Sequence, residues 1–177
     1  MEETPNGRRA AGEGWFVVNA REAVWRVKPG WARSVNFEPE EPRFPEFGIN
    51  VRVLEPGEPN CRYHAEDQQE DFLVISGECL LIVEGEERRL RAWDFVHCPA
   101  WTRHVFVGAG DGPCVIVMAG ARNPDEHLEY PVDDVALRHR AGVERATSSA
   151  EEAYADLTPP TEAPYAPGTL PGEGWSP

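Results

Sequence analysis

Two imidazoles and two carboxylates lie within an otherwise strand-like part of the sequence. His64, Glu66 and Glu70 fall in one short run, and His104 follows later, shortly after Pro99. Because side chains alternate along a strand, His64 and Glu66 are expected on the same face. Imidazole and carboxylate together suit a first-row divalent metal, and two His with one carboxylate is the ligand set of open non-haem iron sites. The pattern therefore predicts a divalent metal centre.

The roles of the two carboxylates are open at this point. Four protein ligands, His64, Glu66, Glu70 and His104, would leave an octahedral ion two positions for water, oxygen or substrate. Alternatively, three side chains bind the metal and Glu66 or Glu70 acts as a general base, which makes these two the catalytic candidates. Two carboxylates favour Mn or Fe, with Ni and Zn as further possibilities for the single divalent ion.

Three neighbouring side chains are candidates for substrate binding. Arg62 shares the strand parity of His64 and is expected either to pair with a substrate carboxylate or phosphate or to neutralise a nearby glutamate. Trp101 lies in the loop before the second imidazole and is expected to shape the entrance of the site. Phe106 shares the parity of that imidazole, where it is either a core residue or a platform for substrate.

Short strand-like runs, separated by turn signals, are the elements that must position these residues. They are predicted at 15–18, 23–27, 34–37, 47–54, 60–64, 71–75, 79–83, 88–91, 94–98, 104–107 and 113–118. Many short strands with no helical period between them indicate a sandwich or small barrel. We therefore predict an all-β fold, closed as a double-sheet jelly-roll barrel.

The two ends of the chain differ from this middle part. Residues 1–14 are polar and predict a disordered N-terminus, and residues 15–122 would form the barrel with a strand-like N-terminal extension. In the C-terminal tail, 123–177, we expect a helix at 132–140 and a second through 157, begun by a capping box at Ser149. The Pro/Gly-rich stretch 159–177 predicts irregular structure that packs on the barrel, with Tyr165 and Trp175 as docking groups.

The residues of the predicted site also resemble the two sequence motifs of the cupins. In the first motif, His64 stands at the first His position, and Glu70 and Gly77 have the spacing of the Glu and the closing Gly. In the second, Pro99 and His104 match the Pro and the His. The resemblance covers about residues 47–122 and implies a jelly-roll barrel with one metal ion at its mouth.

The sequence departs from the cupin pattern at several positions. Glu66 stands at the second His position, Trp93 replaces the Gly that commonly precedes Asp94, and Trp101 replaces the Gly after the Pro. Cupins are commonly homodimers, so the resemblance also implies a dimer. A segment rich in Trp, from Trp15 to Trp31, is predicted to cover an exposed strand edge of the partner.

Composition narrows the class of function. A net charge of −14 argues against binding to nucleic acid or anionic membrane and suits a protein that acts on small molecules. The start of the chain lacks the apolar segment of a signal peptide, so a cytoplasmic protein is expected. The four cysteines have no CxxC spacing and are expected to be small core residues.

Three functions compete. The first is a cupin-type small-molecule metalloenzyme, of dioxygenase, isomerase or lyase type, with substrate at the barrel mouth. The second is a non-catalytic module that binds a sugar or organic acid, with a structural metal or none. The third, ranked last, is a 2-oxoglutarate-dependent oxygenase that uses His64, Glu66 and His104, since no basic residue follows His104 until Arg122.

Overall fold

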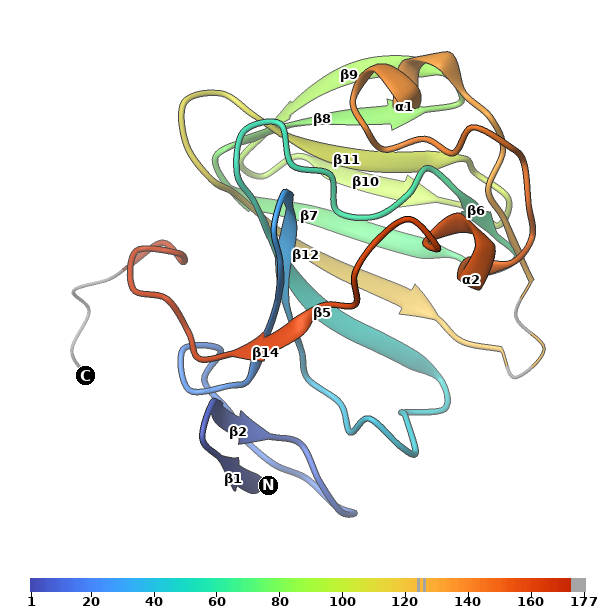
Figure 1. The fold of residues 1–177 in the computed structure, drawn as a ribbon. Coiled ribbons are helices and arrows are strands. Elements are labelled where there is room, and N and C mark those ends of the chain that lie inside the picture. The colour runs from blue at the N-terminus through green and yellow to red at the C-terminus, as the bar shows by residue number, and fades with distance from the viewer. Residues whose placement is uncertain (124, 126, 173–177) are drawn as a thin grey trace.

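Two antiparallel sheets face each other and close into a jelly-roll barrel (Figure 1). The computed structural model describes residues 1–123, 125 and 127–172. Its elements are β1 (Glu2–Thr4), β2 (Gly7–Arg9), β3 (Trp25–Lys28), β4 (Trp31–Asn36), β5 (Phe47–Leu54), β6 (Ala65–Glu66), β7 (Glu70–Ser76), β8 (Glu78–Val83), β9 (Glu86–Arg91), β10 (Phe95–Cys98), β11 (His104–Ala109), β12 (Cys114–Ala121), β13 (Leu128–Glu129), α1 (Asp134–Arg138), α2 (Ala150–Ala153) and β14 (Thr161–Ala163). The all-β prediction is confirmed.

The larger sheet has the strand order β10-β7-β12-β5-β4-β3-β14, and the smaller has the order β11-β8-β9. Between the sheets lies an apolar core that includes Phe72, Val74, Ile116 and Phe106. Val83 and Glu86 face each other where β8 and β9 end their pairing. Apolar and polar residues alternate along these strands. The apolar side chains of each strand therefore lie on the face of the sheet that packs against the other sheet.

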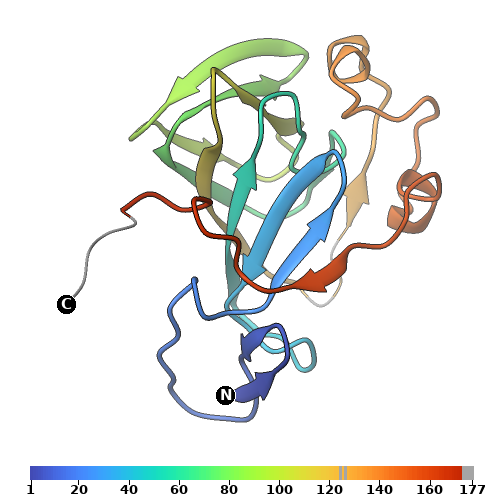
Figure 2. The ribbon, with the colours of Figure 1, turned by 60° about the vertical axis from the view of Figure 1, so that its left-hand side comes forward.

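The outer face of the large sheet is also covered. Trp25, Val35 and Val53 point outward, are almost completely buried, and form a second apolar cluster with Tyr165 and Leu170 of the C-terminal segment. The rings of Trp25 and Tyr165 lie 5.9 Å apart. Figure 2 shows the C-terminal segment crossing this side of the barrel, where β14 pairs with β3. The expected docking of Tyr165 is therefore seen, while Trp175 lies outside the described residues.

Several local predictions differ from the structure. Residues 60–64 form no strand, because the chain bends there and only His64 makes an isolated bridge. Residues 15–18 also form no strand, whereas residues 1–14 contain the hairpin β1–β2. The irregular stretch after 159 contributes β14, whose exposed sequence gave no strand signal.

The two predicted helices are present but short. α1 spans Asp134–Arg138, and α2 spans only Ala150–Ala153. The side chain of Ser149 accepts a hydrogen bond from the amide of Glu152, as the capping prediction requires. Edge coverage of β3 comes from β14 of the same chain, so Trp25 serves the core of its own barrel.

Two tryptophans have backbone conformations that favour glycine. Trp93 has φ = 75° and is mostly exposed, and Trp101 has φ = 67° and is half exposed. A left-handed conformation costs an L-residue about 1–2 kcal/mol. At these two positions the sequence has Trp where the cupin motifs commonly have Gly. The backbone keeps the positive φ that is typical of glycine, although a tryptophan stands there.

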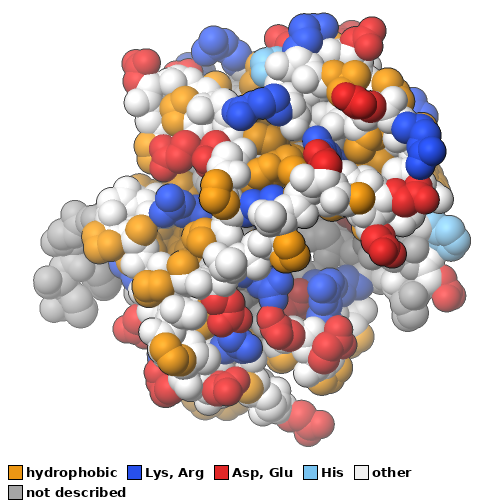
Figure 3. Space-filling model, in the orientation of Figure 1, with side chains coloured by type: hydrophobic (Ala, Val, Ile, Leu, Met, Phe, Trp, Pro, Cys, Tyr) orange, Lys and Arg blue, Asp and Glu red, His pale blue; other side chains and the backbone are white. Residues whose placement is uncertain are grey.

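The four cysteines carry free thiols, and Cys79, Cys98 and Cys114 are buried in the core as expected. In the described part of the chain, no helix is long and apolar enough to cross a membrane. On the face drawn in Figure 3, acidic and basic side chains are interspersed with small hydrophobic groups.

Candidate metal centre

The backbones of His64 and His104 pair with each other at one end of the barrel. The amide of His104 donates to the carbonyl of His64 at 2.8 Å, and the reciprocal bond is 3.2 Å long. This antiparallel bridge places the two imidazole rings 5.0 Å apart, although they come from opposite halves of the barrel sequence. The two predicted imidazoles therefore converge on one site.

Each imidazole is held by the backbone carbonyl that lies two residues before it. The Nδ1 atom of His64 lies 2.9 Å from the carbonyl oxygen of Arg62, and that of His104 lies 2.9 Å from the carbonyl oxygen of Thr102. A carbonyl only accepts hydrogen bonds, so in the neutral form each ring must carry its proton on Nδ1 and keep a lone pair on Nε2. This arrangement orients both rings as metal ligands usually are.

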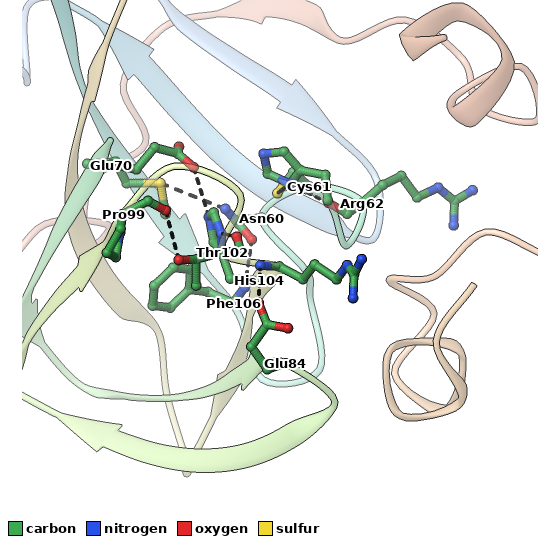
Figure 4. Close-up of polar contacts among 12 residues, drawn as sticks. Asn60, Cys61, Arg62, Glu70, Glu84, Pro99, Thr102, His104 and Phe106 are labelled. Carbon is green, nitrogen blue, oxygen red and sulfur yellow. Dashed lines mark hydrogen bonds and ion pairs between the residues drawn. The ribbon is translucent and has the colours of Figure 1, made fainter. Parts of the chain in front are cut away.

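Glu70 completes the group. One ligand atom from each of His64, Glu70 and His104 lies within 4.8 Å of the other two. The Nε2 atom of His104 is 3.1 Å from Oε2 of Glu70, yet it is buried and has no hydrogen-bond partner among the described residues. Figure 4 shows Glu70 and His104 directed toward each other. A buried nitrogen lone pair beside a carboxylate is what a divalent cation would satisfy, so these residues fit a metal.

The environment also sets suitable protonation states. Burial, and after it the neighbouring His104, lower the pKa of His64 to about 4. Burial alone would lower the pKa of His104, but the Glu70 carboxylate outweighs burial and the net pKa is raised. Burial would raise the pKa of Glu70, but the two imidazoles outweigh it and the net pKa is lowered. At neutral pH, His64 is therefore neutral and Glu70 ionised, as metal ligation requires.

A cavity of about 320 Å³ opens onto these three side chains. Glu66 lines the same cavity, as the alternation from His64 predicts, but it is not part of the group of converging ligand atoms. A Cβ atom added to Gly120 would lie 3.8 Å from Glu70 Cγ and 3.9 Å from Glu66 Oε1, so both carboxylates flank this glycine. The geometry thus separates three candidate ligands from one carboxylate beside them.

The three candidates for substrate binding lie outside this cavity. The guanidinium of Arg62 extends away from His104 (Figure 4), bonds both carboxylate oxygens of Asp156 at 2.7 Å, and donates to the carbonyl of Gly142 at 2.8 Å. Phe106 is fully buried and packs against Phe72 in the core. Trp101 is half exposed in its loop, where its amide donates to the carbonyl of Glu66 at 2.7 Å.

Some residues that line the cavity were not predicted from the sequence. Asn50 and Arg52 of β5 point into it, and Cys61 lies with its Sγ atom 3.6 Å from Nδ1 of His64. Asn50 and Arg52 alternate with Val51 and Val53, a pattern that predicts a solvated face. In the folded barrel both faces of β5 are covered, so the face with Asn50 and Arg52 becomes the wall of a cavity.

The comparisons with known proteins agree with this architecture. Residues 50–120 match the family model described as a cupin domain. The chain is similar to a sugar phosphate isomerase of the cupin superfamily from Silicibacter pomeroyi, at 25% identity over 59% of this chain and 72% of that chain, with a TM-score of 0.52. A protein from Acidithiobacillus ferrooxidans, provisionally named as a sugar phosphate isomerase, is 28% identical over 58% of this chain and 67% of that one, with a TM-score of 0.50.

A third solved structure shares the fold at much lower identity. It is the polyketide cyclase RemF from Streptomyces resistomycificus, at 13% identity over 64% of this chain and 84% of that chain, with a TM-score of 0.55. No curated protein matches the sequence.

Proposed function

We propose that the protein, whose residues 50–120 match the cupin-domain model, is a metalloenzyme that acts on an oxygen-rich small molecule by metal-assisted proton transfer, as an isomerase or a lyase does. The observation that carries this proposal is the group of His64, Glu70 and His104 around one point, with Glu66 beside it in the same cavity. Two neutral imidazoles and a carboxylate can hold Fe, Mn, Ni or Zn and leave positions open for substrate.

The proposed roles follow from the position of each side chain. A divalent ion held by the three ligands would polarise an oxygen of the substrate. Glu66 would move a proton at the neighbouring atom of the substrate, because its carboxylate lines the cavity outside the ligand group. At this site, Thr102 and Arg62 contribute their backbone carbonyls, which fix the imidazole rings.

Proton transfer is preferred over dioxygenation for two reasons. The Glu66 carboxylate lies beside the three-ligand group, where it can act as a base. In addition, two similar structures are named as sugar phosphate isomerases, and isomerisation is a rearrangement rather than an oxidation. Non-catalytic binding of a sugar or organic acid in the same cavity is the alternative.

Elemental analysis of untagged protein, purified without chelator, tests the proposal. We expect near-stoichiometric Fe, Mn, Ni or Zn in the wild type and its loss in a His64→Ala/His104→Ala double variant. The matched control is His97→Ala/His127→Ala, because these two histidines lie on the surface, paired with Asp71 and Asp67. Absence of metal in the wild type, even after reconstitution, would refute the metalloenzyme and leave a metal-free binding barrel.

We also propose that the protein is a homodimer. Large apolar side chains remain exposed on a single chain, notably Trp15 at 92% and Phe95 at 63%. Exposed groups of this size are often covered by a partner. Light scattering coupled to size-exclusion chromatography should give twice the mass of one chain, and the mass of a single chain would contradict the dimer.

A further inference from the structure

A second cavity adjoins the candidate metal centre and has a different chemical character. It has a volume of about 260 Å³ and shares four lining residues with the first cavity: Asn36, Arg52, Asn60 and Cys61. Among the residues that the structure describes, its wall contains Arg26, Lys28 and Arg52 and no carboxylate. In a chain with 31 acidic and 17 basic residues, a cavity wall with three cations and no acid departs strongly from the average surface.

Arg52 is the residue that connects the two cavities. It comes from the inner face of β5, and its Nε atom donates to the side-chain oxygen of Asn50 at 3.2 Å. Within the described residues, its two terminal nitrogens have neither a hydrogen-bond acceptor nor a carboxylate. Burial lowers the pKa of the guanidinium, although Arg52 remains charged at neutral pH. A guanidinium fork that faces a cavity without a partner is suited to a bidentate oxyanion.

Lys28, the only lysine of the chain, lies in the same wall. Its ammonium lies over the rings of Trp31, at 5.3 Å, and Tyr154, at 6.0 Å. The part of the chain that the structure describes offers it no ion pair. The aromatic rings hold the ammonium in place but do not neutralise it. Arg26, by contrast, is paired with Glu40.

Two unpaired cations therefore face one cavity, next to the candidate metal ligands. We infer that this second cavity binds the phosphate group of a phosphate monoester, with Arg52 and Lys28 as its main contacts, while the rest of the same molecule reaches His64, Glu70 and His104. A phosphate monoester carries a charge of about −1.5 to −2 at neutral pH. This charge matches two cations better than the single negative charge of a carboxylate ligand does. The second half of this inference rests on the proposed function; the phosphate site itself does not need the metal.

Calorimetric titration of the metal-free, full-length protein with inorganic phosphate at low ionic strength tests the site. We expect saturable one-to-one binding, weakened roughly tenfold or more by Arg52→Gln and also by Lys28→Gln, because each removes a charge-assisted contact. Arg91→Gln is the matched control: Arg91 is exposed and its side chain lies outside both cavities. That variant should bind phosphate as the wild type does. Thermal unfolding checks that each variant is folded, and Lys28→Gln alone decides if Arg52→Gln does not fold.

Two further titrations separate the possible outcomes. The His64→Ala/His104→Ala variant should keep phosphate binding, so a failure of the metal proposal leaves the phosphate site standing. Loss of phosphate binding in that double variant would instead place the anion at the metal ligands and overturn the inference. Acetate should bind at least tenfold more weakly than phosphate. Equal or tighter binding of acetate would identify a carboxylate site, and no saturable binding of phosphate would exclude the site altogether.

Discussion

The Nε2 atom of His104 lies 3.1 Å from Oε2 of Glu70 without the direction of a hydrogen bond. The contact is therefore mainly electrostatic, between a buried imidazole and a partly buried carboxylate; the pKa of His104 is raised and that of Glu70 is lowered. A divalent cation would satisfy both the Nε2 lone pair and the charge of the carboxylate. This relationship makes Glu70 the carboxylate on which metal binding should depend most.

Glu70→Gln keeps the size of the side chain and removes its charge. We expect metal affinity to fall by at least about tenfold to a hundredfold, because an uncharged amide is a much weaker ligand for a divalent ion. Competition with a chromophoric chelator measures the change. The control is Glu87→Gln, an exposed carboxylate that pairs with His139 on the surface. Unchanged affinity in Glu70→Gln would remove this residue from the ligand set.

Glu66→Gln distinguishes the three-ligand from the four-ligand arrangement. Because Glu66 lies outside the group of converging ligand atoms, we expect this variant to retain stoichiometric metal, with affinity reduced less than tenfold. Turnover of a substrate, once found, should fall by roughly 10²–10⁴-fold, as expected for a lost general base. Metal loss as severe as that in Glu70→Gln would show that Glu66 is a fourth ligand.

The two imidazoles should titrate at well-separated pH values in the metal-free protein. Burial and the neighbouring His104 lower the pKa of His64 to about 4, whereas the Glu70 carboxylate raises the pKa of His104 above its ordinary value of 6.5. NMR titration of the ring protons measures both values. The metal competes with a proton mainly at His104, so its affinity should fall as the pH drops through the higher pKa. In Glu70→Gln burial is no longer opposed, and the pKa of His104 should fall.

Trp93→Gly and Trp101→Gly should each stabilise the protein. Both residues have positive φ, which costs each of them about 1–2 kcal/mol of folding free energy. Substitution by glycine removes this strain but costs about 0.4–1 kcal/mol, because glycine raises the conformational entropy of the unfolded chain. The net gain of about 0.5–1 kcal/mol should raise Tm by roughly 2 °C in scanning calorimetry. Val17→Gly is the control, since Val17 is exposed but is not among the residues with positive φ. A lower Tm in both test variants would mean that the exposed rings contribute packing, for example in a dimer.

Arg62 should anchor the C-terminal segment rather than bind substrate. It donates to the carbonyls of Ala153 and Gly142 and to Asp156, so Arg62→Met should destabilise the fold by about 2–4 kcal/mol. Hydrogen exchange should show faster exchange in α2 (Ala150–Ala153). Asp156→Asn should have a smaller effect, because that carboxylate is 65% exposed and screened by water.

The same ion pair has a defined pH dependence. The Arg62 guanidinium lowers the pKa of Asp156 from its ordinary value of 3.8. The contribution of the ion pair to the stability of the fold is therefore fully present above pH 3.8. It is lost as the pH falls through the lower pKa that Asp156 has in the folded state. Hydrogen exchange in α2 should accelerate in that acidic range in the wild type and show no such step in Asp156→Asn.

Much of the barrel could be predicted from local pattern. The predicted strand at 47–54 coincides with β5, and those at 71–75 and 79–83 lie within β7 and β8. Strand periodicity and turn residues act over a few positions, so a single sequence carries them. The segment 60–64 escaped this reasoning, because the bend that breaks its alternation follows from packing against the second half of the chain.

The sequence by itself determined the all-β architecture and the four residues of the candidate centre, since their types and spacings are local properties of strands and turns. Only the tertiary structure decided which three of them converge, because the pairing of His64 with His104 is a long-range contact. It also turned Arg62 toward the C-terminal segment and brought Arg52 and Lys28 to one cavity. Such assignments depend on which distant segment covers each face of a strand, and strand alternation is the same whichever segment that is.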